Sequence, residues 1–93
     1  MMNLLVATFE LFDKPQENYD ELVNAFRQYP HAFELHKSTW LIVTELEAGS
    51  VYESIANHIG FDDRLFVGEL KNGFWSGAHA ELTEFLRNFW SFD

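Results

Sequence analysis

The chain has 93 residues, with six lysines and arginines against fifteen aspartates and glutamates, and it has no cysteine. A net charge of −9 repels phosphate backbones and disfavours a conventional nucleic-acid-binding protein, while the lack of cysteine excludes disulfides, a thiolate nucleophile and a zinc–thiolate site. The length fits one small domain, residues 1–93, and the 47% apolar content is that of a chain with a packed core.

The first predicted elements are a strand and a helix. Alternating apolar side chains predict a strand over residues 4–12. Pro15 follows, and a proline cannot donate to a strand ladder. Residues 19–26 then carry apolar side chains at helical spacing, which predicts a first helix. Asn18 and Glu21 resemble a capping box at its start.

Two further strands are predicted after this helix. Residues 31–35 and 39–45 are the segments, and the second is rich in β-branched and aromatic residues. Residues 36–38 between them suit a hairpin turn. We therefore expect these two strands to pair with each other.

The remaining elements are a helix, a strand and a last helix. The second helix is predicted to begin at a capping box formed by Ser50 and Glu53 and to end just before Gly60. Residues 64–70 read as a fourth strand. Residues 82–90 repeat Leu, Phe and Trp at helical spacing, so we expect a third helix there.

This order of elements is the α+β, ferredoxin-like βαββαβ pattern with an additional C-terminal helix. Right-handed crossovers interleave the strands into an antiparallel sheet of order 4-1-3-2. The end of the first strand then lies at the same edge of the domain as the starts of the third and fourth strands. The charged residues expected at this edge are Glu10, Asp13, Lys14, His36, Lys37, Asp62, Asp63 and Arg64.

That edge is the first candidate site. Mg²⁺ prefers oxygen ligands, so converging carboxylates such as Glu10 and Asp63 could hold the ion for phosphodiester chemistry. His36 could act there as a general acid or base near neutral pH. The alternative is that acids cluster by chance in such an acidic chain and are neutralised by Lys14 or Arg64 as exposed ion pairs.

The second candidate site is a group of aromatic residues after Gly73. They are Phe74, Trp75, Phe85, Phe89 and Trp90. These rings either close the core over the open face of the sheet or form a self-association surface, because interface cores favour Trp, Tyr and Phe. The two roles can coexist.

Signals for export or membrane insertion are not seen. The first residues lack the basic side chains of a signal peptide and soon meet an acid, Glu10. No apolar stretch approaches the roughly 20 residues that span a bilayer. We therefore expect a cytoplasmic protein without a membrane partner.

Six short motifs suggest a family. They are Phe9-Glu10-Leu11, Lys14-Pro15, Tyr19-x-x-Leu22, Ser38-Thr39-Trp40-Leu41-Ile42, Asp63-x-Leu65-x-Val67-x-Glu69-Leu70 and Trp75-x-Gly77. Together they resemble small bacterial and phage proteins of the SinR family. That family is similar to the ferredoxin-like subunit of CRISPR adaptation complexes and to virulence-associated protein D.

The resemblance implies a homodimer built by packing one sheet against another. In some relatives it also implies a metal-dependent nuclease whose key acid ends the first strand. Glu10 holds that position here, where the relatives usually carry aspartate. Nothing in the chain resembles a helix-turn-helix, so the resemblance does not imply transcriptional regulation.

Three functions follow as hypotheses. The first is a non-catalytic, homodimeric interaction module of a bacterial or phage defence, counter-defence or toxin-related system, which binds itself or another protein and needs no cofactor. The second is a Mg²⁺-dependent endoribonuclease with Glu10 and Asp63 as metal ligands and His36 as a proton carrier. The third is an acidic inhibitor whose carboxylates mimic a nucleic-acid backbone, as the charge of −9 allows.

Overall fold

The computed structural model describes residues 2–73, 76 and 80–89, with side chains up to residue 88. Its elements are β1 (Asn3–Glu10), α1 (Gln16–Arg27), β2 (Ala32–His36), β3 (Thr39–Thr44), α2 (Ala48–Ala56), β4 (Arg64–Leu70) and α3 (Ala80–Phe89). The predicted α+β, ferredoxin-like order with an additional C-terminal helix is confirmed.

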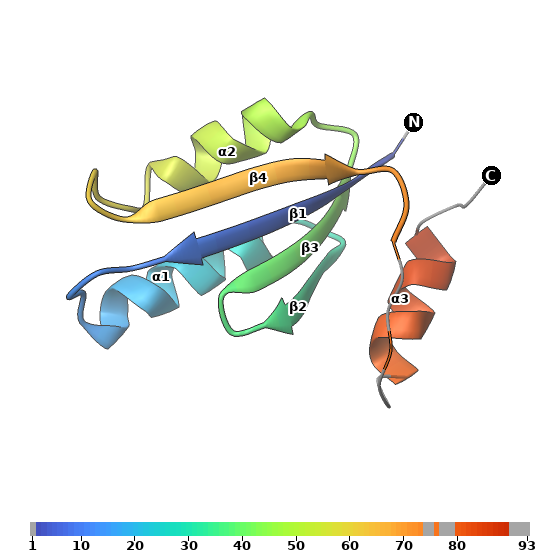
Figure 1. Ribbon diagram of the computed structural model, residues 1–93, viewed down its shortest axis with the longest axis horizontal. Coiled ribbons are helices and arrows are strands. Elements are labelled where there is room, and N and C mark those ends of the chain that lie inside the picture. Colours follow the sequence, from blue (N-terminus) through green and yellow to red (C-terminus); the bar gives the residue numbers. More distant parts are fainter. Residues whose placement is uncertain (1, 74–75, 77–79, 90–93) are drawn as a thin grey trace.

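The four strands form one antiparallel sheet in the order β2-β3-β1-β4, which is the predicted order 4-1-3-2 read from the other side (Figure 1). β1 lies inside the sheet and pairs with β3 and with β4. Its pairing with β4 is regular from Leu4 opposite Leu70 to Glu10 opposite Arg64. β2 and β4 are therefore the two edge strands.

α1 and α2 cover one face of the sheet and enclose the main core (Figure 1). Its buried members are Leu5, Ala7, Phe9, Leu22, Phe26, Trp40, Ile42, Val51 and Ile55. The rings of Phe26 and Trp40 stack with their centroids 5.3 Å apart. Burying a large apolar side chain contributes about 1.5–3 kcal/mol, so this layer is a main source of the stability of the fold.

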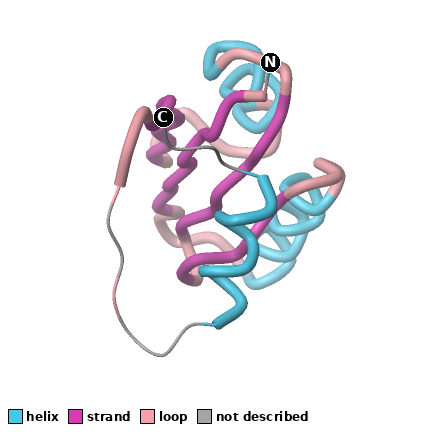
Figure 2. The backbone as a smooth tube through the Cα atoms, turned by 90° about the vertical axis from the view of Figure 1, so that its right-hand side faces the viewer, coloured by secondary structure: helices cyan, strands magenta, loops and turns pink. Residues whose placement is uncertain are grey.

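α3 packs on the second face, at one end of the sheet (Figures 1 and 2). This smaller core consists of Leu4, Leu41, Val43, Leu82 and Leu86. The ring of Phe85 adds to it, 5.3 Å from the ring of Phe33. At the other end of this face Phe66 is 60% exposed, so the described part of α3 covers only part of the sheet.

Both predicted capping boxes are wrong, because the N-caps of α1 and α2 are Pro15 and Glu47, three residues before the predicted ones. The N–H of Asn18 donates to the carbonyl of Pro15 at 3.0 Å, and the N–H of Ser50 donates to the carbonyl of Glu47 at 3.1 Å. Backbone carbonyls therefore satisfy these N–H groups, and the helices begin without a side-chain cap.

Two predicted element ends are also too late. β1 ends at Glu10 because the N–H of Phe12 turns away to the side chain of Asp63 and Asp13 adopts a left-handed conformation with φ of 52°. α2 ends at Ala56, since the N–H groups that follow bond to carbonyls three residues back, as in turns. A hydrogen bond between distant segments thus ends β1, and local turn hydrogen bonds end α2, before the apolar periodicity stops.

Candidate functional site

The predicted sheet edge does bring charged residues together. Glu10 is the last residue of β1 and lies directly opposite Arg64, the first residue of β4. The Nη1 atom of Arg64 is 3.8 Å from Oε1 of Glu10, and both side chains are largely exposed. Exposed pairs of this kind contribute at most about 1 kcal/mol. The Glu10 carboxylate therefore faces solvent beside a cation.

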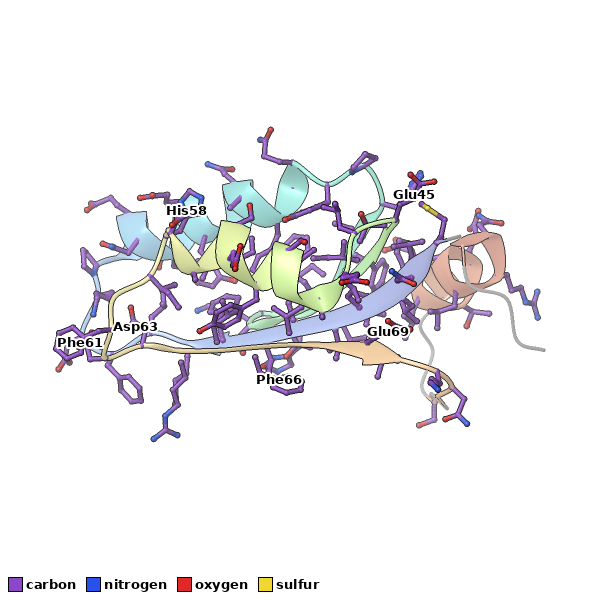
Figure 3. The ribbon with its side chains drawn as sticks, turned by 90° about the horizontal axis from the view of Figure 1, so that it is seen from above. Glu45, His58, Phe61, Asp63, Phe66 and Glu69 are labelled. Atoms are coloured by element: carbon purple, nitrogen blue, oxygen red, sulfur yellow. The ribbon has the colours of Figure 1, made fainter. Side chains whose placement is uncertain are left out.

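Asp63 lies in the loop between α2 and β4 and is held inside it, with a side chain only 1% exposed (Figure 3). Its Oδ1 accepts hydrogen bonds from the N–H of Phe12 at 2.9 Å and from Nζ of Lys14 at 3.2 Å. Its Oδ2 accepts one from the N–H of Gly60 at 2.8 Å. These bonds, the one from Phe12 above all, hold the pKa of Asp63 below its ordinary value. We call this arrangement the Asp63 clasp.

The ammonium of Lys14 lies at the centre of the same group of acids. It is 3.0 Å from the carbonyl of Phe12, 3.2 and 3.4 Å from the two carboxylate oxygens of Asp62, and 3.2 Å from Oδ1 of Asp63. The hydrogen bond to Asp63 is the main reason that the pKa of Lys14 is raised. A lysine therefore neutralises this acidic loop.

The Mg²⁺ site predicted at Glu10 and Asp63 does not fit this geometry. Both carboxylate oxygens of Asp63 already accept hydrogen bonds, and one of these bonds comes from the ammonium of Lys14. Glu10 pairs with Arg64 instead. Among the described side chains, no three from His, Asp and Glu come together as a metal would require. Asp63 is a structural residue here.

His36 lies where the topology predicted, at the same edge as Glu10. It is the last residue of β2 rather than part of the turn, and it lines a pocket of ≈ 310 Å³ with Glu10 and Lys37. Its imidazole forms no hydrogen bond or ion pair with the described residues. A general base is usually oriented by a neighbouring group, and His36 has no such support here.

Three exposed aromatic side chains at this end of the domain were not predicted: Phe12, Phe61 and Phe66. Phe61 is fully exposed in the loop before β4, and Phe66 points away from α1 and α2 (Figure 3). The ring of Phe66 lies over Gly68, where a Cβ atom would come within 2.9 Å of it. Alternation along β4 was the missed signal, because Phe66 falls on the face opposite Leu65 and Val67.

We call the uncovered part of the second sheet face the open patch. It consists of Thr8, Glu10, Arg64 and Phe66, in which Thr8 pairs with Phe66 and Glu10 with Arg64. These four residues also line a shallow pocket of ≈ 450 Å³. The open patch thus combines an aromatic ring, an arginine and a carboxylate.

The predicted C-terminal aromatic surface is described only at Phe85. That ring packs on Phe33 in the second core, which is the core-closing role considered for this group. Phe89 is the last residue of α3, and its side chain is not among those described. Phe74, Trp75 and Trp90 lie outside the described residues.

Within the described residues, no helix is long and apolar enough to cross a bilayer. No protein-family model matches the chain, and a search of curated proteins gives no significant match. What the chain does must therefore be inferred from its own residues.

Proposed function

We propose that this chain is a non-catalytic, homodimeric ferredoxin-like interaction module. The observation that carries the proposal is Phe66, a large apolar side chain that is 60% exposed in the middle of an edge strand. Arg64 lies on the same face two residues away. Aromatic residues and arginine are the types enriched at the energetic centres of protein interfaces.

A second copy of the chain is the partner that the proposal names. An interface around a two-fold axis needs a self-complementary surface, and the open patch carries an arginine, a carboxylate and an apolar ring. The resemblance to the SinR family supports a homodimer as well. It also points to service in a bacterial or phage defence, counter-defence or toxin-related system.

The contacts of the candidate acidic residues support a non-catalytic role. The Asp63 carboxylate is committed to the Asp63 clasp, and Glu10 pairs with Arg64. His36 is exposed without a group that orients it. A nuclease would need these groups directed at one reacting atom.

Light scattering coupled to size-exclusion chromatography tests the proposal. At micromolar concentration we expect a mass twice the 10.9 kDa of one chain. Phe66→Ser should raise the dissociation constant of the dimer about tenfold or more, because a central aromatic contact is lost. Leu35→Ser is the matched control, since Leu35 is also a partly exposed apolar residue but lies on the other edge strand.

The control variant should associate like the unchanged chain. A single-chain mass at every micromolar concentration would refute the proposed function. Equal weakening by both substitutions would show that Phe66 is not the centre of the contact.

A further inference from the structure

The two edges of the sheet differ in how they are protected. An edge strand presents unpaired N–H and C=O groups, and proteins normally guard it by shortness, a bulge, lysine, proline or a covering element. β2 is guarded in three of these ways. It has five residues, its pairing with β3 is irregular between Glu34 and His36, and α3 packs against it.

β4 lacks most of these protections within the described structure, although α2 packs against it on one face of the sheet. It has seven residues, pairs with β1 without a bulge, and contains neither lysine nor proline. Its four residues between Arg64 and Glu69 are uncharged. No described strand pairs with its outer side, and Figure 3, which looks onto this side of the domain, shows α2 to one side of the strand.

We infer that β4 pairs antiparallel with β4 of a second copy, with a two-fold axis at Val67, so that two four-stranded sheets become one continuous sheet. The inference rests on the proposed homodimer and names its contact. It differs from sheet-against-sheet packing, because the main-chain groups of the β4 edge hold the two copies together. The open patches of the two copies then lie side by side on one face.

Strand geometry limits the possible registers. Two identical antiparallel strands related by a two-fold axis have one residue that faces its own copy, and residues opposite each other point to the same face. With Val67 at the axis, Phe66 lies opposite Gly68 of the second copy. Val67 is the middle residue of β4, so this register pairs the whole strand with its copy, from Arg64 opposite Leu70 to Leu70 opposite Arg64.

The charges of β4 are compatible with this register. With Val67 at the axis, Arg64 lies opposite Leu70 and Glu69 lies opposite Leu65, so no like charges are opposed within the strand.

The overall charge of the chain also favours this contact. Two copies that each carry −9 repel one another, so association is easiest where acids are fewest. Residues 64–71 contain two basic side chains, Arg64 and Lys71, and a single acid, Glu69. The β4 edge therefore joins the copies through a segment that is not acidic.

The absence of cysteine makes a clean cross-linking test possible. Three full-length variants, Val67→Cys, Thr8→Cys and Leu35→Cys, each carry one thiol. Opposed residues of an antiparallel pair have Cα atoms about 4.5–5.5 Å apart, within the range of a disulfide. We expect mild oxidation to convert most of Val67→Cys into a linked dimer, while Thr8→Cys and Leu35→Cys remain single chains.

A second measurement covers the case in which the Val67→Cys thiol is hindered. Hydrogen–deuterium exchange of the unchanged chain should show β4 amides that become at least tenfold better protected as the concentration rises through the dimer dissociation constant. Amides of β2, the other edge, should exchange at the same rate throughout. Thermal unfolding of each cysteine variant checks that it has folded.

The outcomes separate this inference from the proposed function. A dimer that links through Thr8→Cys, or one whose β4 amides gain no protection, would overturn the β4 pairing and leave the homodimer standing. A chain that is a monomer throughout would overturn both. Linking at Val67→Cys together with protection of β4 supports the inference.

Discussion

At the scale of single residues, the Asp63 clasp is the most specific feature of the domain. One carboxylate accepts hydrogen bonds from two backbone N–H groups, of Phe12 and Gly60, and from Lys14. It thereby joins the end of β1 to the loop that leads into β4. Hydrogen bonds to a charged acceptor are stronger than those to a neutral one. Replacing this carboxylate would therefore weaken or remove three strong hydrogen bonds, and a buried donor left without a partner is costly.

Asp63→Asn should therefore lower the melting temperature by several degrees at neutral pH. The amide keeps the shape but presents an NH₂ group to one of the donors. Asp62→Asn is the matched control. Asp62 is the neighbouring residue, its side chain is 52% exposed, and its pair with Lys14 is a surface ion pair. Circular dichroism during heating measures both, and equal shifts for the two variants would contradict the structural role of Asp63.

Asp63 should also make the stability of the fold depend on pH. The folded protein holds the pKa of Asp63 below the ordinary 3.8, chiefly through the N–H of Phe12. Its stabilisation is therefore complete above the unfolded pKa and is lost as the pH falls through the lower folded pKa. The difference in melting temperature between the unchanged chain and Asp63→Asn should be constant down to about pH 5 and shrink below about pH 4. A difference that grew in acid would be the wrong sign.

At the scale of elements, α3 determines how much of the second sheet face is covered. Leu82 and Leu86 bury against strand residues, and Phe85 packs on Phe33. The opposite end of that face carries Phe66, exposed on the edge strand β4. The short reach of α3 thus divides one sheet face into a core and the open patch.

Leu86→Ala tests the contribution of α3. Leu86 is buried in the second core, so the substitution should lower the free energy of unfolding by about 2–4 kcal/mol through lost burial and a cavity. Asn88→Ala, at an exposed position of the same helix, should change it by less than about 0.5 kcal/mol. Urea unfolding measures both. A loss of similar size in the two variants would mean that α3 does not pack on the sheet.

The start of α2 gives a second test at this scale. Ser50 lies inside the helix, and the carbonyl of Glu47 accepts its N–H, so its hydroxyl does not cap the helix. Ser50→Ala should change the free energy of unfolding by less than about 0.5 kcal/mol, like Ser54→Ala on the exposed surface of α2. A loss near 1 kcal/mol in urea unfolding, for Ser50 alone, is what a true cap would give.

Elements were predictable from sequence because each must bury one face, and burial imposes a period of two or 3.6 residues. Their ends were less predictable because they depend on contacts between distant residues. The end of β1 is an example, since it follows from the bond between Phe12 and Asp63, which are 51 residues apart. Apolar spacing also marks α3 as a helix without saying which face of the sheet it covers.

At the scale of the whole molecule, topology made the candidate site partly predictable. The order of the strands placed Glu10, His36 and Arg64 at one edge, and the structure confirms that placement. The predicted strand order could not show that Asp63 turns inward to backbone donors, because that depends on the conformation of the loop before β4. The exposure of Phe66 depends in turn on how far α3 extends across the second face.

The charge and the exposed edge together define how we expect the molecule to associate. A chain of charge −9 is repelled by its own copies over most of its surface, whereas residues 64–71 hold two basic side chains and one acid. Lys71→Glu should therefore raise the dimer dissociation constant about tenfold, with a smaller effect at high salt, because it replaces a basic side chain beside the β4 edge with an acid and so increases the repulsion between the two copies there. Glu53→Lys on the exposed surface of α2 is the control for net charge, and sedimentation velocity compares the two variants. Effects of equal size in the two variants would show that net charge, rather than the position of Lys71 beside β4, governs association.

Sedimentation equilibrium of the unchanged chain tests the central claim most directly. Over a range of micromolar concentrations, the homodimer predicts a weight-average mass that rises to twice 10.9 kDa and stops there, because a closed two-fold contact uses up the β4 edge. A mass that stays at 10.9 kDa throughout would contradict the account, and so would one that climbs past the dimer without limit.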